Sequence, residues 1–526
     1  MTVHPVLIDG EWSASVGQST FQATNPATKQ PLPDEYPVSP WEELERALEA
    51  ATTASREMRG WSGERFATFL EKYADRIDAR AEELSSLANL ETALPVSPRL
   101  KDVELPRTTN QLRQAAGAAR EGSWTVPTID TQANIRSMYG PIGPVVIFGP
   151  NNFPFAFNGI SGGDFAAAVA AGNPVIAKGH SSHPGTSRLF AEEAAKAARE
   201  TEMPSGFVQL IYRTSHEDGA RLVGDSRVGA IGYTGARKTG LVLKEAADKA
   251  GNPIYLELSS INPVFILPGA LEERGESIAE EFTGSCLLGT GQFCTNPGLV
   301  VLLAGEQTEA FIQSVATRFA EAPVGTMLSG GVQAHFESGI KELTSAGAEV
   351  LAGGGPADGS GFCYQNTLLR TDGATFLNNP ESLQTEAFGN GSLIVVADDV
   401  EQMLAIAESL EGNLTGCFYT HSAGNDDEIY ARIEPAVRVR VGRLLNDKMP
   451  TGVAVSPAMN HGGPFPATGH PVFTAVGIPA SIHRFSQLWC YDGIRHDRLP
   501  PNLQNDNPNG ALWRNIDGYW TRESLS

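Results

Sequence analysis

Short apolar segments alternate with helical segments between Pro141 and Leu258, and this alternation most constrains how the chain can fold. Strands that alternate with helices form parallel sheets, because each helix carries the chain back across the sheet. The pattern therefore predicts a doubly wound α/β domain. Its strands are expected at Pro144–Phe148, Pro174–Ala177, Phe207–Ile211, Val228–Tyr233 and Ile254–Leu258, and its helices at Gly159–Ala171, Gly185–Arg199, Glu217–Val223 and Lys238–Ala250.

A second alternation follows Pro263 and predicts a second doubly wound α/β domain, with strands at 263–267, 298–303, 392–396 and 416–420. Residues 40–122 are expected to be helical, with one helix at Trp41–Arg56 and another at Glu64–Ala88. Trp124–Met138 has β character, and roughly the last 25 residues are expected to be irregular. We therefore divide the 526 residues into a first domain (1–123 and 141–258), a second domain (259–472), and a small β arm with a C-terminal tail (124–140 and 473–526).

Charge and cysteine usage limit the class of protein. The net charge of −22 argues against nucleic acid and membranes as partners, because clustered Lys and Arg bind both. The cysteines are odd in number and include no Cys-x-x-Cys pair, so we predict neither a disulfide scaffold nor a metal site. The N-terminus does not resemble a signal peptide, and no apolar run reaches the roughly 18 residues of a membrane span. These features predict a cytoplasmic enzyme.

Cys294 in Gly291-Gln-Phe-Cys294-Thr is the candidate nucleophile, and Glu257 lies 37 residues upstream at the end of an apolar run. A cysteine with a carboxylate, and without an obvious histidine partner, indicates a thioester enzyme in which the acid activates water. That chemistry indicates aldehyde oxidation. The alternatives are a buried core cysteine and a carboxylate at the end of a surface strand.

Other motifs in the same order along the chain resemble those of the aldehyde dehydrogenase superfamily over nearly the full length. They are Ile8-Asp-Gly-Glu-Trp12, Gly149-Pro-Asn-Asn152-Phe-Pro154, Lys178, Tyr233-Thr-Gly235, Leu256-Glu257-Leu258, Gly291-Gln-Phe-Cys294 and Glu386-Ala-Phe388-Gly389. The stretch His461-Gly-Gly-Pro-Phe-Pro-Ala467 resembles the branch of 2-oxoglutarate semialdehyde (2,5-dioxopentanoate) dehydrogenases and NADP-linked fatty-aldehyde dehydrogenases. The resemblance implies that the first domain binds the cofactor and the second is catalytic.

The resemblance also implies roles for the catalytic residues. Cys294 attacks the aldehyde, Asn152 and the Cys294 backbone N–H stabilise the oxyanion, and Glu257 activates the water that hydrolyses the thioester. The family forms dimers or dimers of dimers through a strand arm, so 124–140 and part of the tail are expected at subunit contacts.

No Gly-x-Gly-x-x-Gly loop follows a predicted strand, so the expected nicotinamide cofactor rests on the resemblance. The residues implied to hold it are Lys178, Gly235, Ala236, Glu386 and Phe388. Ser181 stands where NAD-preferring members often have a glutamate that repels the 2′-phosphate of NADP, and Arg213 is a further phosphate candidate. We therefore expect NADP to be preferred and NAD to be usable.

The aldehyde tunnel is expected to be lined by Phe153, Phe157, Ile160, Phe293 and Phe465. A dicarboxylic semialdehyde needs a cation for its distal carboxylate. Some semialdehyde dehydrogenases carry this cation as an arginine at the position of Ile160, where the present chain has none. Arg113 is the alternative cation for the distal carboxylate. The competing interpretation of Arg113 is an ordinary arginine on a helix surface. Ser259-Ser260 and Asn390 depart from the family pattern, and His461 is interpreted as an extra base or a loop-stabilising residue.

The function implied is NAD(P)-dependent oxidation of an aldehyde, with 2,5-dioxopentanoate as the first substrate candidate. The alternatives are a medium- or long-chain aliphatic aldehyde dehydrogenase, a CoA-acylating relative, and a catalytically silent binding member of the fold.

Overall fold

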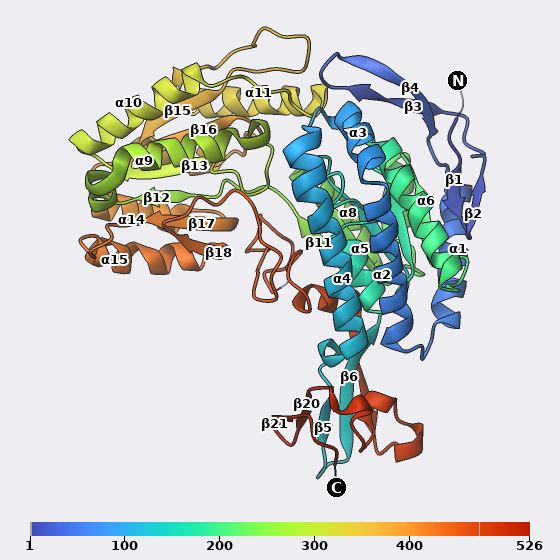
Figure 1. Cartoon of the computed structure of the whole chain (residues 1–526). Coiled ribbons are helices and arrows are strands. Elements are labelled where there is room, and N and C mark those ends of the chain that lie inside the picture. Colours follow the sequence, from blue (N-terminus) through green and yellow to red (C-terminus); the bar gives the residue numbers. More distant parts are fainter. Residues whose placement is uncertain (1–2, 473, 526) are drawn as a thin grey trace.

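The computed structural model of the chain describes residues 3–472 and 474–525. Two α/β domains stand beside each other, and a narrow β arm projects away from them (Figure 1). The predicted first domain starts at Met1 and the predicted tail runs from Phe473 to Ser526. Met1, Thr2, Phe473 and Ser526 lie outside the described residues, and the boundaries between the parts stay predictions.

The first domain is built on a seven-stranded sheet in the order β11-β10-β7-β8-β9-β1-β2. The strands from β11 to β9 are parallel, and the β1–β2 hairpin adds antiparallel to β9. These parallel strands are short and almost fully buried, as expected when helices cover both faces of a sheet. Its strands are β1 (Val6–Ile8), β2 (Glu11–Ser13), β7 (Val145–Phe148), β8 (Val175–Lys178), β9 (Val208–Ile211), β10 (Ala230–Thr234) and β11 (Ile254–Glu257).

Eight α-helices and one wide helical turn surround this sheet in the described chain. They are α1 (Trp41–Glu57), α2 (Gly63–Ala79), α3 (Ala81–Thr92), the turn η1 (Val96–Glu104), α4 (Leu105–Glu121), α5 (Gly163–Ala170), α6 (Pro184–Glu200), α7 (His216–Val223) and α8 (Arg237–Ala250). The single helix predicted at Glu64–Ala88 is wrong. Arg80 has non-helical backbone angles and separates α2 from α3.

The second domain repeats the architecture with a sheet in the order β14-β15-β16-β13-β12-β17-β18, in which only β14 is antiparallel among the described strands. Its strands are β12 (Val264–Ile266), β13 (Leu299–Leu303), β14 (Glu349–Ala352), β15 (Thr367–Asp372), β16 (Gly391–Ala397), β17 (Asn413–Tyr419) and β18 (Val441–Asn446). Its helices are α9 (Pro268–Leu287), η3 (Leu288–Gly291), α10 (Glu306–Glu321), α11 (Gly330–Ser345), α12 (Gly373–Asn378), α13 (Pro380–Leu383), α14 (Val400–Ser409) and α15 (Asp427–Arg438).

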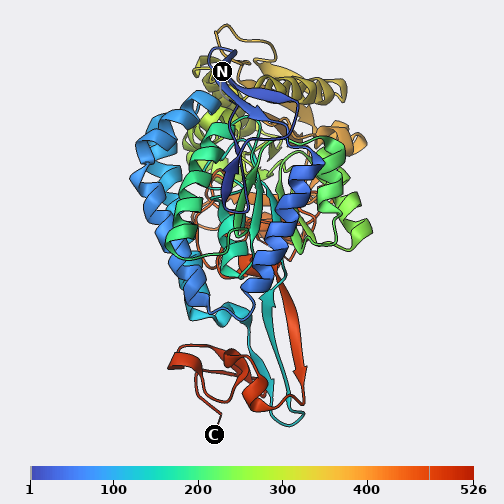
Figure 2. The ribbon, with the colours of Figure 1, turned by 90° about the vertical axis from the view of Figure 1, so that its right-hand side faces the viewer.

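The arm is a five-stranded sheet in the order β19-β6-β5-β20-β21. Its strands are β5 (Thr128–Asp130), β6 (Ile135–Pro141), β19 (Ser486–Asp492), β20 (Arg514–Ile516) and β21 (Tyr519–Thr521). The long β6–β19 pair joins two distant parts of the sequence and carries the arm away from the body (Figure 2). The irregular end predicted for the tail is wrong, because β20 and β21 form a hairpin there. A separate ribbon pairs β3 (Thr20–Asn25) with β4 (Gln30–Pro37).

The two domains meet where β11 ends and the chain crosses to β12. Glu257 closes β11, and residues 258–263 lead into the second sheet. Ligands of open α/β sheets bind at the carboxyl ends of the strands, so this crossing is where a site is expected. No helix in the described part of the chain combines the length and apolar character that a bilayer crossing needs.

Candidate active site

Cys294 lies in a tight loop after α9 and η3. Gly289, Thr290 and Gly291 all have positive φ angles. A Cβ on Gly291 would collide with the carbonyl of Gly389, so only glycine permits this approach of the cysteine loop to the loop that carries Glu386. Asn262 holds the far side of the loop, because its Nδ2 donates to the Cys294 carbonyl and the Asn296 carbonyl, each at 2.9 Å.

Glu257 ends β11 with only 3% of its side chain exposed. Its carbonyl accepts a 3.1 Å hydrogen bond from the Gly235 amide, and its backbone forms a bridge to Thr468. Oε1 is hydrogen-bonded, whereas Oε2 is buried and has no hydrogen-bond partner among the described residues. A buried carboxylate oxygen without a partner is costly and is available to a water molecule.

His461 is the third member of this cluster. Its ring is 1% exposed, and Nε2 lies 2.9 Å from Glu257 Oε1 and 3.4 Å from Cys294 Sγ. The His461 amide donates to Thr474 Oγ1 at 2.6 Å, and the His461 carbonyl accepts from the Ala475 amide at 2.8 Å. The sequence shows no obvious histidine partner for Cys294, and the structure brings His461 to it. His461 contacts both candidate catalytic groups.

The protons of this cluster are constrained by its geometry. Burial raises the pKa of the Cys294 thiol well above its usual value, and the nearby Glu257 carboxylate raises it further. His461 Nε2 faces both Sγ and Oε1, so a hydrogen on Nε2 would be shared between them. Both contacts are attractive when an imidazolium N–H faces a thiolate and a carboxylate.

The Glu257, Cys294 and His461 ligand atoms lie within 4.8 Å of one another, a spacing that could also hold a metal. The absence of a metal stays a prediction.

Asn152 follows β7 and points at the cysteine loop, with Nδ2 3.0 Å from the Gln292 carbonyl. Its turn is fixed by Glu104, whose Oε1 accepts from the Phe155 and Ala156 amides at 2.9 and 3.0 Å. Arg99 pairs with Glu104 and donates to the Asn152 carbonyl at 3.1 Å. The Cys294 amide has no acceptor among the described residues. The loops that carry the two predicted oxyanion donors therefore contact each other two residues before Cys294.

Three of the five predicted tunnel residues form an aromatic cluster beside Cys294. The Phe153 ring centroid lies 5.3 Å from that of Phe157 and 5.4 Å from that of Phe293. Phe157 also lies 5.9 Å from the His461 ring, so the cluster reaches the catalytic side chains. Ala475 and Val476 complete its buried part.

The other predicted substrate residues lie elsewhere. Ile160 is fully buried in the large hydrophobic core and not in the aromatic cluster. Phe465 is 54% exposed, and the Cζ atom of Arg237 lies 5.4 Å from the Phe465 ring centroid. Arg113 forms ion pairs of 2.8 Å with both Asp75 and Asp78 on the surface of α2. The structure does not bring these three residues to the aromatic cluster.

Two departures from the family pattern have structural roles. The Ser260 hydroxyl lies 2.9 Å from Asn262 Oδ1 and accepts from the Leu414 amide at 2.9 Å. It ties the segment after Glu257 to the second domain. Asn390 Nδ2 donates to the Tyr364 carbonyl at 2.9 Å and to Asn366 Oδ1 at 2.8 Å, which fixes the segment after Phe388.

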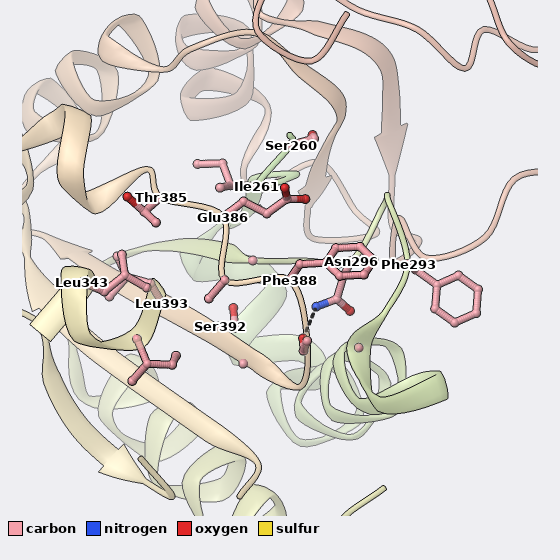
Figure 3. A pocket seen from close by; sticks show the side chains of 16 residues that line it. Ser260, Ile261, Phe293, Asn296, Leu343, Thr385, Glu386, Phe388, Ser392 and Leu393 are labelled. Atoms are coloured by element: carbon pink, nitrogen blue, oxygen red, sulfur yellow. Dashed lines mark hydrogen bonds between the residues drawn. The ribbon is translucent and has the colours of Figure 1, made fainter. Parts of the chain in front are cut away.

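Glu386 and Phe388 line a pocket between the cysteine loop and α11. Glu386 lies on the side of Ser260 and Ile261, while Leu343 and Leu393 lie on the opposite side (Figure 3). Burial raises the pKa of Glu386 to about 7, and the Ser259 hydroxyl and Ser260 amide oppose that shift by hydrogen bonding. A carboxylate at such a wall suits a diol, because its oxygens accept two hydroxyl hydrogens.

The remaining predicted cofactor residues lie at the carboxyl ends of the first sheet. Lys178 ends β8, and burial together with the charge of Arg213 lowers its pKa to about 8, so it is largely a cation below that pH. Ser181 follows in the next turn and is partly exposed. Gly235 and Ala236 precede α8, whose first turn has no side-chain cap because its N-cap residue is Ala236. Free amides at a helix N-terminus favour phosphate, so these residues fit a dinucleotide.

Two doubly wound α/β domains, the first with residues that fit a dinucleotide and with a cysteine and a carboxylate at the junction, are the arrangement expected of a nicotinamide-dependent oxidoreductase. The sequence matches the aldehyde dehydrogenase family over residues 12–458, and the chain belongs to that family. It is an oxidoreductase that acts on aldehydes with a nicotinamide cofactor, and both the predicted activity and the predicted fold are confirmed.

The chain is 37% identical over 514 residues to alpha-ketoglutaric semialdehyde dehydrogenase 2 of Azospirillum brasilense, covering 95% of this chain and 97% of the relative. It is 33% identical to alpha-ketoglutaric semialdehyde dehydrogenase of Acinetobacter baylyi, covering 94% and 96%. Among solved structures, the NAD⁺ complex of aldehyde dehydrogenase from Bacillus cereus superposes with a TM-score of 0.79 at 21% identity, covering 93% of this chain and 96% of that one. These similarities confirm the predicted branch of the family.

Proposed function

We propose that the chain oxidises 2,5-dioxopentanoate, also called alpha-ketoglutaric semialdehyde, to 2-oxoglutarate. The observation that supports the chemistry best is the contact of His461 with both Cys294 and Glu257 beside the aromatic cluster. The two relatives named for this substrate align with nearly the whole chain. Medium-chain aliphatic aldehydes are the second candidate, because the rings of Phe153, Phe157 and Phe293 also suit an alkyl chain.

The proposed mechanism starts with transfer of the Cys294 proton to His461 Nε2, which leaves a thiolate beside an imidazolium. Sγ attacks the aldehyde carbon, and Asn152 Nδ2 with the Cys294 amide binds the oxyanion of the thiohemiacetal. A nicotinamide cofactor, when bound, accepts the hydride whose loss turns the thiohemiacetal into a thioester. Glu257 then takes a proton from a water molecule. That water attacks the thioester carbon, the C–S bond breaks, and Sγ regains its proton from His461.

The proposed cofactor preference is NADP over NAD. This proposal is supported by Lys178 at the end of β8 and by Arg213 after β9, whose charge acts on Lys178, while Ser181 follows Lys178 by three residues. Two cations and a neutral hydroxyl attract a 2′-phosphate, and position 181 carries no carboxylate to repel it. The uncapped first turn of α8 would receive the pyrophosphate, and Glu386 would bind the ribose next to the nicotinamide.

We also propose that the arm forms subunit contacts in a homodimer or a dimer of dimers. It exposes large apolar side chains at Leu488, Trp513, Tyr519 and Trp520, and β19 is an edge strand. All five cysteines are free, which suits the reducing cytoplasm as the proposed location.

The proposed function is tested with purified enzyme, NADP or NAD, and three aldehydes. We expect kcat/KM to be highest with 2,5-dioxopentanoate, at least about tenfold above 5-oxopentanoate and hexanal, and higher with NADP than with NAD. Higher kcat/KM with hexanal would favour the aliphatic assignment, and turnover only after addition of CoA would favour an acylating enzyme. No reduced cofactor with any aldehyde would identify a silent member.

His461 is expected to control the ionisation of Cys294. In the His461→Asn variant, the pH profile of iodoacetamide alkylation at Cys294 should move to higher pH, because the thiolate loses its imidazolium partner. We expect kcat/KM to fall about 10²-fold, the lower range for a general base. The His335→Asn variant changes an exposed histidine on α11 and is the matched control. An alkylation profile that does not move in the His461 variant would remove the assigned role.

A further inference from the structure

Arg107 lies against the aromatic cluster of Phe153, Phe157 and Phe293. It lies in the first turn of α4, and its Cζ is 5.7 Å from the Phe153 ring centroid and 5.3 Å from the Phe157 ring centroid. Phe157 in turn lies 5.9 Å from His461. One phenyl ring therefore separates this guanidinium from the catalytic histidine.

The guanidinium of Arg107 has an unused hydrogen-bonding edge. Nε and Nη2 are buried and have no hydrogen-bond partner among the described residues. In the same part of the chain, Arg99 is bound by Glu104 and the Asn152 carbonyl, and Arg113 by Asp75 and Asp78. The charge of Glu104 acts on Arg107, but the Glu104 carboxylate is bound by Arg99 and two backbone amides and makes no hydrogen bond to Arg107 Nε or Nη2.

A buried guanidinium without an anion is costly, since arginine stays charged even in an apolar environment. Burial lowers the pKa of Arg107, and the charges of Glu104, Cys294 and Glu257 oppose that shift. Nε and Nη2 form the side of the guanidinium that binds a carboxylate through two parallel hydrogen bonds. The unpartnered Nε and Nη2 of Arg107 are therefore arranged to bind a carboxylate.

We propose that Arg107 binds the distal carboxylate of a short ω-oxo acid whose aldehyde carbon is held at Cys294. The inference rests on the proposed function and deepens it, because it assigns the cation that a semialdehyde requires. It replaces Arg113, which lies on the same helix and is occupied by surface carboxylates. The rings of Phe153 and Phe157 would cover the carbon chain between the two ends.

The test compares Arg107→Met with the matched control Arg113→Met, using 2,5-dioxopentanoate, 5-oxopentanoate and hexanal. We expect Arg107→Met to lower kcat/KM for both oxo acids by about 10²-fold, mainly through KM, and to change it for hexanal by less than about threefold. Arg107→Lys should recover part of the loss, because lysine supplies the charge without the paired geometry. Arg113→Met should behave as wild type with every aldehyde.

Inhibition by glutarate, measured with hexanal as substrate, separates this inference from the proposed function. Glutarate should compete with hexanal in the wild type and lose that competition in Arg107→Met. One outcome is that hexanal proves the better substrate while glutarate still inhibits the wild type and no longer inhibits Arg107→Met. In that case the proposed function fails and the carboxylate site stands. If 2,5-dioxopentanoate is the preferred substrate and its KM is the same in Arg107→Met as in the wild type, the carboxylate site at Arg107 is overturned and the proposed function stands.

A different role for Arg107 is stabilisation of the Cys294 thiolate. It predicts equal losses with all three aldehydes and an alkylation profile shifted to higher pH, and that result would overturn the carboxylate site. A melting temperature near that of the wild type confirms that each variant is folded.

Discussion

Replacing Cys294 with alanine is expected to lower kcat by at least about 10⁴-fold, because no other described side chain at the junction can form the covalent intermediate. Reduced cofactor should not appear even in the first turnover, since the thiohemiacetal precedes hydride loss. Stopped-flow absorbance at 340 nm would measure this burst, and fluorescence titration would show that the variant still binds NADP.

The control for this prediction is Cys363→Ala, which removes another free cysteine outside the Cys294 loop. That variant should retain wild-type turnover. Aldehyde oxidation that persists in Cys294→Ala would exclude the thioester route altogether.

In the Glu257→Gln variant, we expect the rate of cofactor reduction in the first turnover to stay unchanged. The steady-state rate of the following turnovers should fall by about 10²- to 10⁴-fold, the range for loss of a general base. Glutamine can still accept the Nε2–H of His461 through its carbonyl, so the cluster keeps its shape. It cannot take a proton from the water that approaches the unpartnered Oε2 position. The acyl-enzyme should accumulate on Cys294.

A burst of reduced cofactor close to one per active site, followed by a slow steady state, would measure this effect. Intact-protein mass spectrometry should detect the acyl adduct on Glu257→Gln. A variant that turns over at the wild-type rate would assign water activation to another group, and His461 would be the first candidate.

Much of the fold was predictable because its signal is local. The segments at Pro144–Phe148, Pro174–Ala177 and Ile254–Leu258 are apolar and short, and β7, β8 and β11 lie there. The helix boundary at Arg80 was missed, since charged and apolar residues continue the same helical spacing on both sides of it. The hairpin of β20 and β21 was missed because its stability depends on pairing with β5, which is distant in sequence.

Candidate site residues can be proposed from sequence where a motif surrounds them, but their tertiary contacts cannot be predicted in this way. Cys294 and Glu257 stand in recognisable motifs. The contact of His461 with Glu257 spans 204 residues, so neither spacing nor composition could reveal it. Arg107 and Arg113 lie on one helix and cannot be distinguished by sequence. Only packing shows that Arg113 meets two aspartates while Arg107 faces Phe153 and Phe157.

The β6–β19 pair has a consequence for how the molecule is made. Gln487 on β19 donates to the Pro141 carbonyl, a contact across 346 residues. During synthesis, the rest of the first domain and the whole second domain therefore leave the ribosome before β19 can pair with β6. Long-range pairing of this kind is slow, and until it forms, the edge of β6 that does not pair with β5 is open to association. The arm is thus the last part of the subunit to form, and chains that stop before β19 should be prone to aggregate.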